Sequence, residues 1–390
     1  MIIIDDVRVY GYQRTQKEIL LDFNEGFSTK LGGSPTGYFS NSKKYPSYRY
    51  RMPIAVSGQT TELINKTVFI EVNTAALIPS KMQADCDDIR FTDGDDNQTL
   101  DYWIETGECD NAATGIWVET KALTANKTDK IYMYYGNPSA SAASSGTNTF
   151  LFFDDFSGSS LDTSKWTTVV GSGVSVSGGE LTLTGSANWK PGIFTSASFP
   201  TDRVITIKVK RVAGGSHWGF TDQNTAVSLN TTGESGVIND GGVNWYGFSA
   251  HLSTYNQVLL SASDASYHTW DIARNSSTSV IQKRDGVTQT THTTNLPVGT
   301  LRIGMNTSGS GSAMTADYVF VREYSSTEPT ASLGTEESNL VPVAHYRFEE
   351  GSGTTTTDAT SNDNDLTLVN TPTWTTSGKF GSALDFESSS

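Results

Sequence analysis

Residues 316–322 read ADYVFVR, and residues 4–10 read IDDVRVY. Each stretch has an acidic residue followed by an alternating run, the pattern of a β-strand with one buried face. The copy at 316–322 follows a full domain of other strand patterns, so we expect it to close that domain. The copy at 4–10 has no domain before it, and we therefore expect the chain to begin at the end of one.

Short strand patterns and turn signals fill most of the remaining sequence. The strand patterns are clearest in Thr67–Val72, Gly115–Thr120, Lys130–Tyr135, Glu180–Leu183, Val204–Val212 and Ser279–Arg284. Turn signals such as Asp93-Gly94 and Asp285-Gly286 separate them. Only TQKEILLDF at 15–23 spaces its apolar residues as a short helix does. The sequence therefore predicts an all-β fold of β-sandwich or jelly-roll domains in tandem.

The length of 390 residues exceeds what one hydrophobic core usually organises, so we expect two or more domains. The Ser-, Ala-, Gly- and Thr-rich stretches 138–148 and 325–342 are typical of linkers. Beyond the second one, residues 345–350 and 378–387 begin a new alternation that is too short to enclose a core. The chain is thus expected to end inside a further domain.

The charge balance disfavours several classes of partner. The chain has 27 Lys and Arg against 42 Asp and Glu, a formal net charge of -15, which repels nucleic acid and anionic membrane surfaces. It has no apolar stretch of about 20 residues that could cross a bilayer. Residues 1–4 run directly into Asp5-Asp6 without the basic region of a signal peptide. We expect no membrane insertion, and any export signal to lie outside this chain.

Two blocks at the chain ends resemble a laminin-G-like (concanavalin A-like) jelly roll. The stretch IDDVRVYGYQRTQKEILLDFN at 4–24 resembles its last strand and terminal helix. Residues 343–370, which begin VAHYRFEE, and KFGSALDF at 379–386 resemble its first strands.

Two further blocks lie between them. The first resembles a domain of unknown function that is common in prokaryotic surface proteins. The resemblance lies in YRYRMPIAV at 48–56, CDDIRFTDGD at 86–95, YWIE at 102–105, IWVE at 116–119 and IYMYYGNPSA at 131–140. That family commonly has Trp where this chain has Tyr48. FFDDFSGSSLDTSKW at 152–166 and DYVFVREYSSTEPTASLGTEE at 317–337 resemble a concanavalin A-like jelly roll, whose opening is also similar to laminarinase-type glycoside hydrolases. These resemblances imply four segments, at 1–27, 45–140, 150–337 and 341–390.

The hydrolase resemblance allows a test for catalytic residues, because retaining glycosidases need two carboxylates about 5–5.5 Å apart. The strands available for them, Val204–Val212, Ala226–Asn230 and Val258–Ala262, have no acidic residue. The histidines fall in no nucleophile-elbow or zinc-protease pattern; they are His217, His251, His268, His292 and His345. We therefore expect a protein that is not an enzyme.

A structural Ca²⁺ is the one cofactor that the jelly-roll resemblance implies, because such folds often hold one where the first and last strands meet. The resemblance assigns it to Asp317 with Asp154 or Asp155, and to Asp6, with Asp358, in the split terminal domain. The alternative is that these aspartates accept backbone N–H bonds at strand ends. Cys86 and Cys109 are compatible with a disulfide, the alternative being two buried free thiols.

Aromatic residues of the third segment could stack on the faces of sugar rings. The candidates for carbohydrate contact are Trp189, Trp218, Trp245 and Tyr246, although tryptophans in a sandwich also serve as core residues. Sequons permit N-glycosylation at Asn65, Asn97, Asn126, Asn230, Asn275 and Asn306. In a chain this rich in Ser and Thr, several arise by chance.

The function predicted from these patterns is structural and adhesive: a non-catalytic segment of an extracellular, tandem-repeat surface or fibre protein, which contacts neighbouring repeats or subunits. One alternative is a carbohydrate-binding, lectin-like module that recognises cell-surface or matrix glycans. Another is a subunit of a head-to-tail filament, in which the strands of one chain end complete the split domain of the next subunit.

Overall fold

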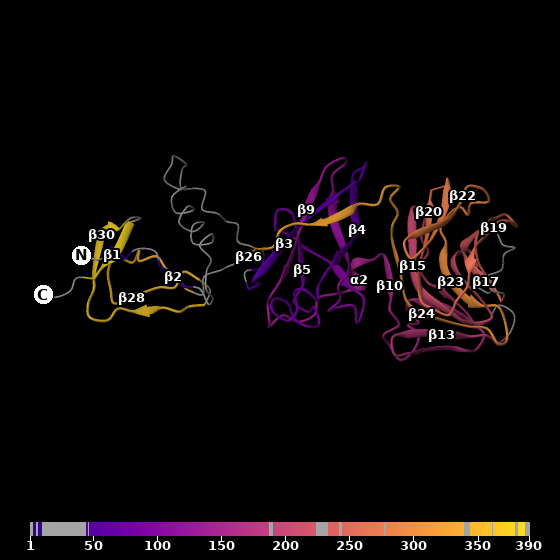
Figure 1. Ribbon diagram of the computed structural model, residues 1–390, viewed down its shortest axis with the longest axis horizontal. Helices are drawn as coiled ribbons and strands as arrows, with labels where there is room; N and C mark the ends of the chain where they lie inside the picture. The colour runs from indigo at the N-terminus through magenta and orange to yellow at the C-terminus, as the bar shows by residue number, and fades with distance from the viewer. Residues whose placement is uncertain are drawn as a thin grey trace.

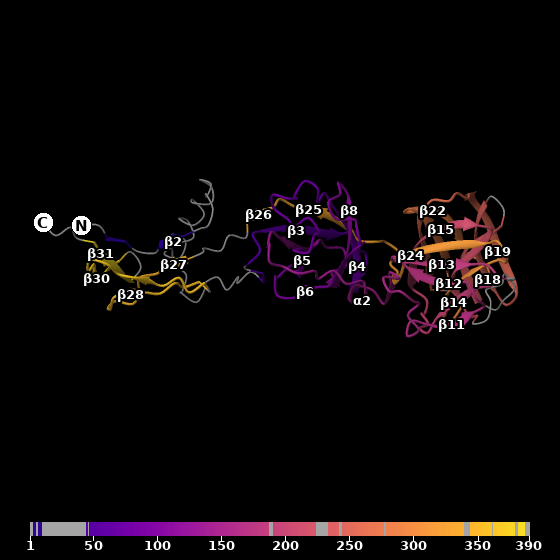
Figure 2. The same cartoon turned by 90° about the horizontal axis from the view of Figure 1, so that it is seen from below.

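The computed structural model describes residues 3–4, 7–9, 44–45, 47–186, 190–223, 233–241, 244–276, 278–338, 344–360, 362–378 and 381–386. Three β-rich bodies follow one another along the longest axis (Figures 1 and 2). The expected all-β class is confirmed, since the described residues form strands with one short helix, α2 (Gly146–Thr149). No helix within the described ranges is long and apolar enough to cross a membrane. The helix predicted at 15–23 lies outside the described residues.

The middle sandwich has two sheets. One has the order β25-β3-β9-β5-β6, formed by Thr330–Leu333, Tyr50–Ser57, Asp129–Tyr135, Arg90–Asp93 and Thr99–Leu100. The other has the order β4-β8-β7, formed by Leu63–Val72, Thr114–Leu123 and Tyr102–Ile104. The core between them is made of alternate residues, among them Ile54, Val68, Ile70, Phe91, Ile116, Val118 and Met133. The strands predicted at 67–72, 115–120 and 130–135 are confirmed within β4, β8 and β9.

The stretch expected to be a linker at 325–342 returns to the middle sandwich instead. β25 and β26 (Glu337–Ser338) both pair with the edge strand β3. Two ion pairs fix the return, Arg51 Nε to Glu337 at 2.7 Å and Lys81 Nζ to Glu336 at 2.6 Å. The expected boundary at 337 is therefore wrong, because residues 330–338 complete the preceding domain. Their short, polar sequence gives no strand signal without the partner edge.

The jelly roll forms the body at the other end of the chain axis. Its eight-stranded sheet contains β12 (Val174–Ser177), β13 (Glu180–Thr184), β24 (Ala313–Glu323), β15 (Arg203–Ala213), β20 (His268–Asn275), β21 (Ser279–Arg284) and β22 (Val287–His292), with β10 (Phe152–Asp154) also on β24. Its seven-stranded sheet contains β11 (Trp166–Val170), β14 (Gly192–Thr195), β23 (Arg302–Thr307), β16 (Gly215–Thr221), β17 (Gly233–Asp240), β18 (Asn244–His251) and β19 (Thr254–Ala262). The stretch 316–322 lies within β24, which pairs with β10, β13 and β15.

The third body joins strands from the two chain ends. β1 (Ile3–Ile4) pairs with β31 (Gly381–Asp385), and β2 (Val7–Val9) pairs with β27 (Ala344–Tyr346). β30 (Thr373–Gly378) pairs with β31, while β28 (Thr355–Thr356) pairs with β29 (Leu366–Thr367). A small core surrounds Tyr346 and Leu384. The two ends thus complement each other within one chain, and complementation between subunits stays a prediction.

Cys86 and Cys109 form a disulfide, with Cα atoms 5.9 Å apart. It joins the loop before β5 to the loop after β7, and Cys86 belongs to the core of the middle sandwich. The bond closes a loop of 23 residues. Closing a loop of this length restricts the unfolded chain and stabilises the fold by about 3 kcal/mol.

Replacing both cysteines by serine is expected to lower the free energy of unfolding of the middle sandwich by about 3 kcal/mol, because the unfolded chain regains the entropy of an open loop. Urea unfolding followed by tryptophan fluorescence measures the change. A reducing agent should shift the midpoint of the parent protein and leave that of the double variant unchanged. An equal response of both proteins to the reducing agent would contradict the assignment.

Candidate functional site

Two of the residues predicted to contact a sugar are buried in the structure and cannot do so. Trp218 on β16 and Trp245 on β18 are each 1% exposed and belong to the jelly-roll core. Their ring centroids lie 5.1 Å apart, and both rings stack edge-on against Trp270 of the opposite sheet. Side chains enclosed between two sheets cannot reach a sugar, so the core role is the correct one. Tyr246 is partly exposed, and Trp189 lies outside the described residues.

The residues proposed for Ca²⁺ do not fit the ion. Asp154 accepts a hydrogen bond from Trp166 Nε1 at 2.7 Å and lies 3.4 Å from the Lys165 ammonium. Asp317 pairs with Lys208 at 3.0 Å. Ca²⁺ needs six to eight oxygen ligands, and lysine ammonium groups already neutralise both carboxylates.

The other aspartates proposed as calcium ligands follow the alternative interpretation. Asp155 accepts from the backbone N–H of Ser157 at 3.2 Å, and Asp358 accepts from that of His345 at 2.9 Å. Asp6 lies outside the described residues. The part of the chain that the structure describes contains no cluster of three metal-ligating side chains.

The predicted glycosylation sites differ in exposure. Asn65, Asn97 and Asn126 are exposed, and Asn275 is partly exposed. Asn306 on β23 is fully buried, so the folded chain cannot present it to a glycosyltransferase. Asn230 lies outside the described residues.

The seven-stranded sheet has one carboxylate that the sequence reasoning missed. Glu234 on β17 is fully buried and accepts a hydrogen bond from Thr221 Oγ1 at 2.7 Å. The strand that the sequence predicts at 226–230 lies outside the described residues, whereas β17 begins at Gly233.

An aromatic seam joins the middle sandwich to the jelly roll. Trp103 on β7 contacts the rings of Phe150, Phe153, Tyr318 and Phe320 edge-on, with centroids 5.1–5.9 Å apart. All five side chains are less than 10% exposed. Edge-to-face contacts between buried rings add to the gain from burying their apolar area, so the seam holds the two domains in a defined orientation.

A cavity of about 560 Å³ opens beside this seam, and we call it the aromatic cleft. The register of β4, β8 and β7 places Phe69, Trp117 and Trp103 side by side across the sheet. Their neighbours in sequence, such as Val68 and Ile116, point into the middle core, so alternation directs the three aromatic side chains outward. Trp103 becomes buried in the seam, whereas Phe69 stays 46% exposed.

Polar groups surround these aromatic side chains. The remaining lining of the aromatic cleft consists of Glu105, Glu108, Ala113, Gly115, Thr206, Thr269, Asp271, Asp285, Gly286, Tyr318, Arg322, Glu328 and Pro329. Both domains therefore contribute to it. A concave site with apolar rings and a few carboxylates and hydroxyls has the composition of a small-molecule or glycan site.

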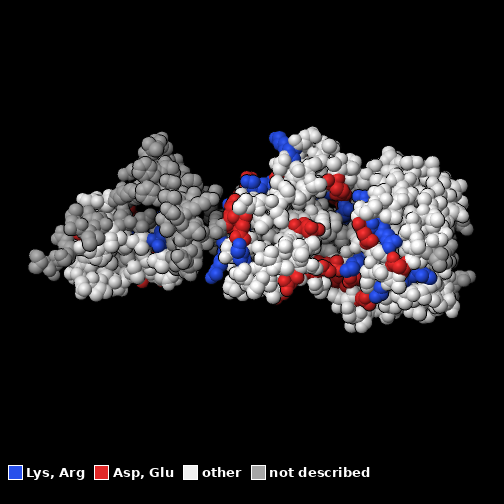
Figure 3. All heavy atoms as spheres, in the orientation of Figure 1, with Lys and Arg blue, Asp and Glu red and all other residues white. Residues whose placement is uncertain are grey.

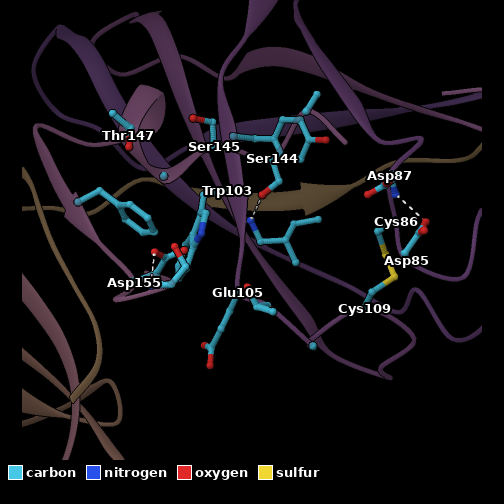
Figure 4. A pocket seen from close by; sticks show the side chains of 18 of the residues that line it. Asp85, Cys86, Asp87, Trp103, Glu105, Cys109, Ser144, Ser145, Thr147 and Asp155 are labelled. Carbon is cyan, nitrogen blue, oxygen red and sulfur yellow. Dashed lines mark hydrogen bonds between the residues drawn. A yellow bond between two sulfur atoms is a disulfide. The ribbon is translucent and has the colours of Figure 1, made fainter. Parts of the chain in front are cut away.

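A second cavity, of about 680 Å³, lies on the other side of Trp103 and Glu105, which line both cavities. Figure 4 shows this polar cleft, with Asp155 and Trp103 on one side and the Cys86–Cys109 disulfide on the other. Asp85, Asp87, Ser144 and Thr147 also line it. The side chain of Glu105 extends downward from its strand end in this view.

Buried charges connect the two domains beneath the aromatic cleft. Lys66 on β4 is 1% exposed, and its ammonium lies 2.7 Å from Glu328 and donates to the carbonyl of Glu323 at 2.7 Å. Glu328 also pairs with Arg322 at 2.7 Å, and Arg322 lies 3.4 Å from Asp271. Glu105 pairs with Lys208 of the jelly roll, while burial raises the pKa of the Glu105 carboxyl.

The comparisons with known proteins give one family match. Residues 85–169 match the family described as Domain of unknown function (DUF2341). The match runs from the disulfide loop into the first strands of the jelly roll. It includes every residue that lines the polar cleft except Ala84. No curated protein matches this chain.

Several solved structures are similar to part of this chain, at low identity and low TM-score. A glycosyl hydrolase family protein from Mycobacterium fortuitum is 18% identical with a TM-score of 0.36, over 44% of this chain and 99% of that chain. A chain from work on endo-acting O-glycanases of the human gut microbiota is 17% identical with a TM-score of 0.37, over 45% and 100%. An immunostimulatory antigen and pseudo beta-1,3-glucanase of Mycobacterium tuberculosis is 15% identical with a TM-score of 0.36, over 45% and 99%.

These comparisons correct the expectation of a structural, adhesive, non-catalytic segment. The names of the similar structures include a glycosyl hydrolase family protein, endo-acting O-glycanases and a beta-1,3-glucanase, not spacers or fibres. We withdraw that interpretation. At TM-scores of 0.36–0.37 the likeness carries no argument about activity, which has to be argued from this chain's own residues.

Lys66 gives the domain junction a dependence on pH. Burial, and then the nearby Arg322, lower the pKa of Lys66 from 10.5 to about 8, although Glu328 opposes the shift. Between pH 8 and 10.5 the unfolded chain binds the proton more tightly than the folded one, so stability rises with pH there. The free energy of unfolding should increase from pH 7.5 to 9.5 more in the parent protein than in Lys66→Met. Urea unfolding at both pH values tests this, and identical pH dependence in the two proteins would refute it.

Proposed function

We propose that the aromatic cleft binds carbohydrate. The observation that carries this proposal is the outward pair Phe69 and Trp117, whose ring centroids lie 5.1 Å apart at the mouth of a cavity lined with carboxylates and hydroxyls. The C–H faces of a sugar ring pack on such aromatics, and its hydroxyls donate to carboxylates. Glycans thus remain the proposed partners, but at a site different from the one predicted from the sequence.

The two aromatic side chains are held ready for stacking. The ring of Phe69 lies over Gly115, where an added Cβ would come within 2.8 Å of it, so any other residue at 115 would displace the ring. The guanidinium of Arg322 lies over the Trp117 ring, 5.1 Å from its centroid. A pre-organised aromatic surface loses little conformational entropy on binding.

The free acceptors of the aromatic cleft favour neutral sugars. Asp271 and Glu328 are neutralised by Arg322 and Lys66, whereas the Glu108 carboxylate accepts a hydrogen bond from the neutral Asn111 Nδ2 at 3.1 Å. The chain as a whole has a net charge of -15. Sulfated or uronic acid chains would meet like charge here, so the proposed ligand is an uncharged glycan.

The carboxylates of the aromatic cleft support the binding of a glycan more directly than its cleavage. A retaining glycosidase needs one carboxylate free to attack and a second one protonated. Of the carboxylates lining the aromatic cleft, Glu105, Asp271 and Glu328 each pair with a Lys or Arg, so none of the three is free to attack a sugar ring. The disulfide is consistent with the oxidising, extracellular setting in which surface glycans are met.

The variant Phe69→Ala should weaken glycan binding at least about tenfold, or about 1.4 kcal/mol, because the exposed stacking ring is lost. A glycan array with the full chain identifies a neutral ligand, and calorimetry then compares the parent protein with the variant. Phe386→Ala is the matched control, since Phe386 is 41% exposed and lies outside the aromatic cleft.

Two outcomes would count against the proposal. An array without any bound neutral glycan, or equal affinities of the parent protein and Phe69→Ala, would remove the site. Release of reducing ends from a β-glucan by the purified chain would instead overturn the restriction to binding.

A further inference from the structure

The strand β19 forms one edge of the seven-stranded sheet, where its only strand partner among the described residues is β18. It is nine residues long. Both views place it at the end of the molecule that faces away from the middle sandwich (Figures 1 and 2). This location leaves its outer edge clear of the other two bodies.

The sequence of β19 lacks the charged residues and the proline that usually protect an edge strand, although its register with β18 is interrupted at Leu260. TYNQVLLSA has no Lys, Arg, Asp, Glu or Pro, and Tyr255 and Leu259 are 47% and 58% exposed. Natural edges are normally short, charged, bulged outward or covered, because unpaired N–H and C=O groups recruit another strand. Figure 3 shows few charged side chains on this end of the jelly roll, in contrast to the middle sandwich.

The structures that flank β19 extend this neutral edge. The turn between β18 and β19 has Leu252 and Ser253 at φ of 50° and 64°, and Leu252 is 67% exposed. A left-handed conformation costs conformational free energy for a bulky residue. This turn bears that cost while it presents an apolar side chain to solvent. The neighbouring edge strand β22 is also free of acidic residues and lysine, with Val287 63% exposed.

We propose that β19 pairs antiparallel with β19 of a second copy of this chain, which joins the two seven-stranded sheets into one. Tyr255, Gln257 and Leu259 pair with Ala250, Phe248 and Tyr246 of β18, so they share one face of the sheet. A twofold axis at Gln257 places Tyr255 opposite Leu259 of the other copy, twice. Each pair joins an aromatic and an aliphatic side chain across the strands.

A second copy fits this edge better than a charged partner does. The net charge of -15 makes two copies repel each other over most of their surfaces. An edge without charges is where two such chains approach at least electrostatic cost. The same nine residues supply both halves of the contact, as a twofold interface requires.

Sedimentation velocity of the full chain over a range of concentrations tests the dimer. We expect a concentration-dependent dimer for the parent protein and a monomer for Leu259→Lys, which places a charge in the paired edge. Val369→Lys is the matched control, because Val369 is 73% exposed but lies in the terminal body; it should dimerise like the parent protein. Circular dichroism confirms that both lysine variants are folded.

Cysteine cross-linking tests the register independently. Directly opposed residues of antiparallel strands have Cα atoms about 4.5–5.5 Å apart, within the range of a disulfide. Gln257→Cys should therefore form a covalent dimer on mild oxidation, and Ser261→Cys, which lies away from the axis, should not. A parent protein that is monomeric at all concentrations, a Leu259→Lys dimer, or equal cross-linking at both positions would overturn the proposal.

Discussion

The packing of Trp103 against four rings of the adjoining domain is the contact on which the rest of the structure depends. Phe150, Phe153, Tyr318 and Phe320 surround it edge-on. This seam fixes the middle sandwich on the outer face of the eight-stranded sheet. Both cavities exist only because the two domains are held in this orientation, since each is lined by residues from both sides of the junction.

The chain path and the buried charges reinforce the same junction. After β24 the chain returns to add β25 and β26 to the middle sandwich, so residues that follow the jelly roll in the sequence complete this domain. Glu328, on the returning segment, neutralises Lys66 of one domain and Arg322 of the other. Removing one member of such a buried network leaves an uncompensated charge, which is costly. The two sandwiches therefore form one structural unit and are not independent domains joined only by a linker.

The two proposed surfaces lie apart on this unit. The aromatic cleft is at the domain junction, and β19 is at the far end of the jelly roll (Figure 1). A dimer through β19 would leave both aromatic clefts open and would present two glycan sites on one particle. Paired sites raise the effective affinity for a surface that carries many copies of a glycan.

The sequence by itself determined the all-β class, the positions of six strands and the pair of cysteines, because alternation and turn residues are local signals. It could not decide which face would meet a core, a second domain or solvent, and so it left Trp218 and Trp245 open between a sugar site and the core in which they are buried. Only the tertiary structure brought Lys165 to Asp154 and Lys208 to Asp317, and returned 330–338 to β3. Those contacts join residues from different strands and loops, and no local pattern records them.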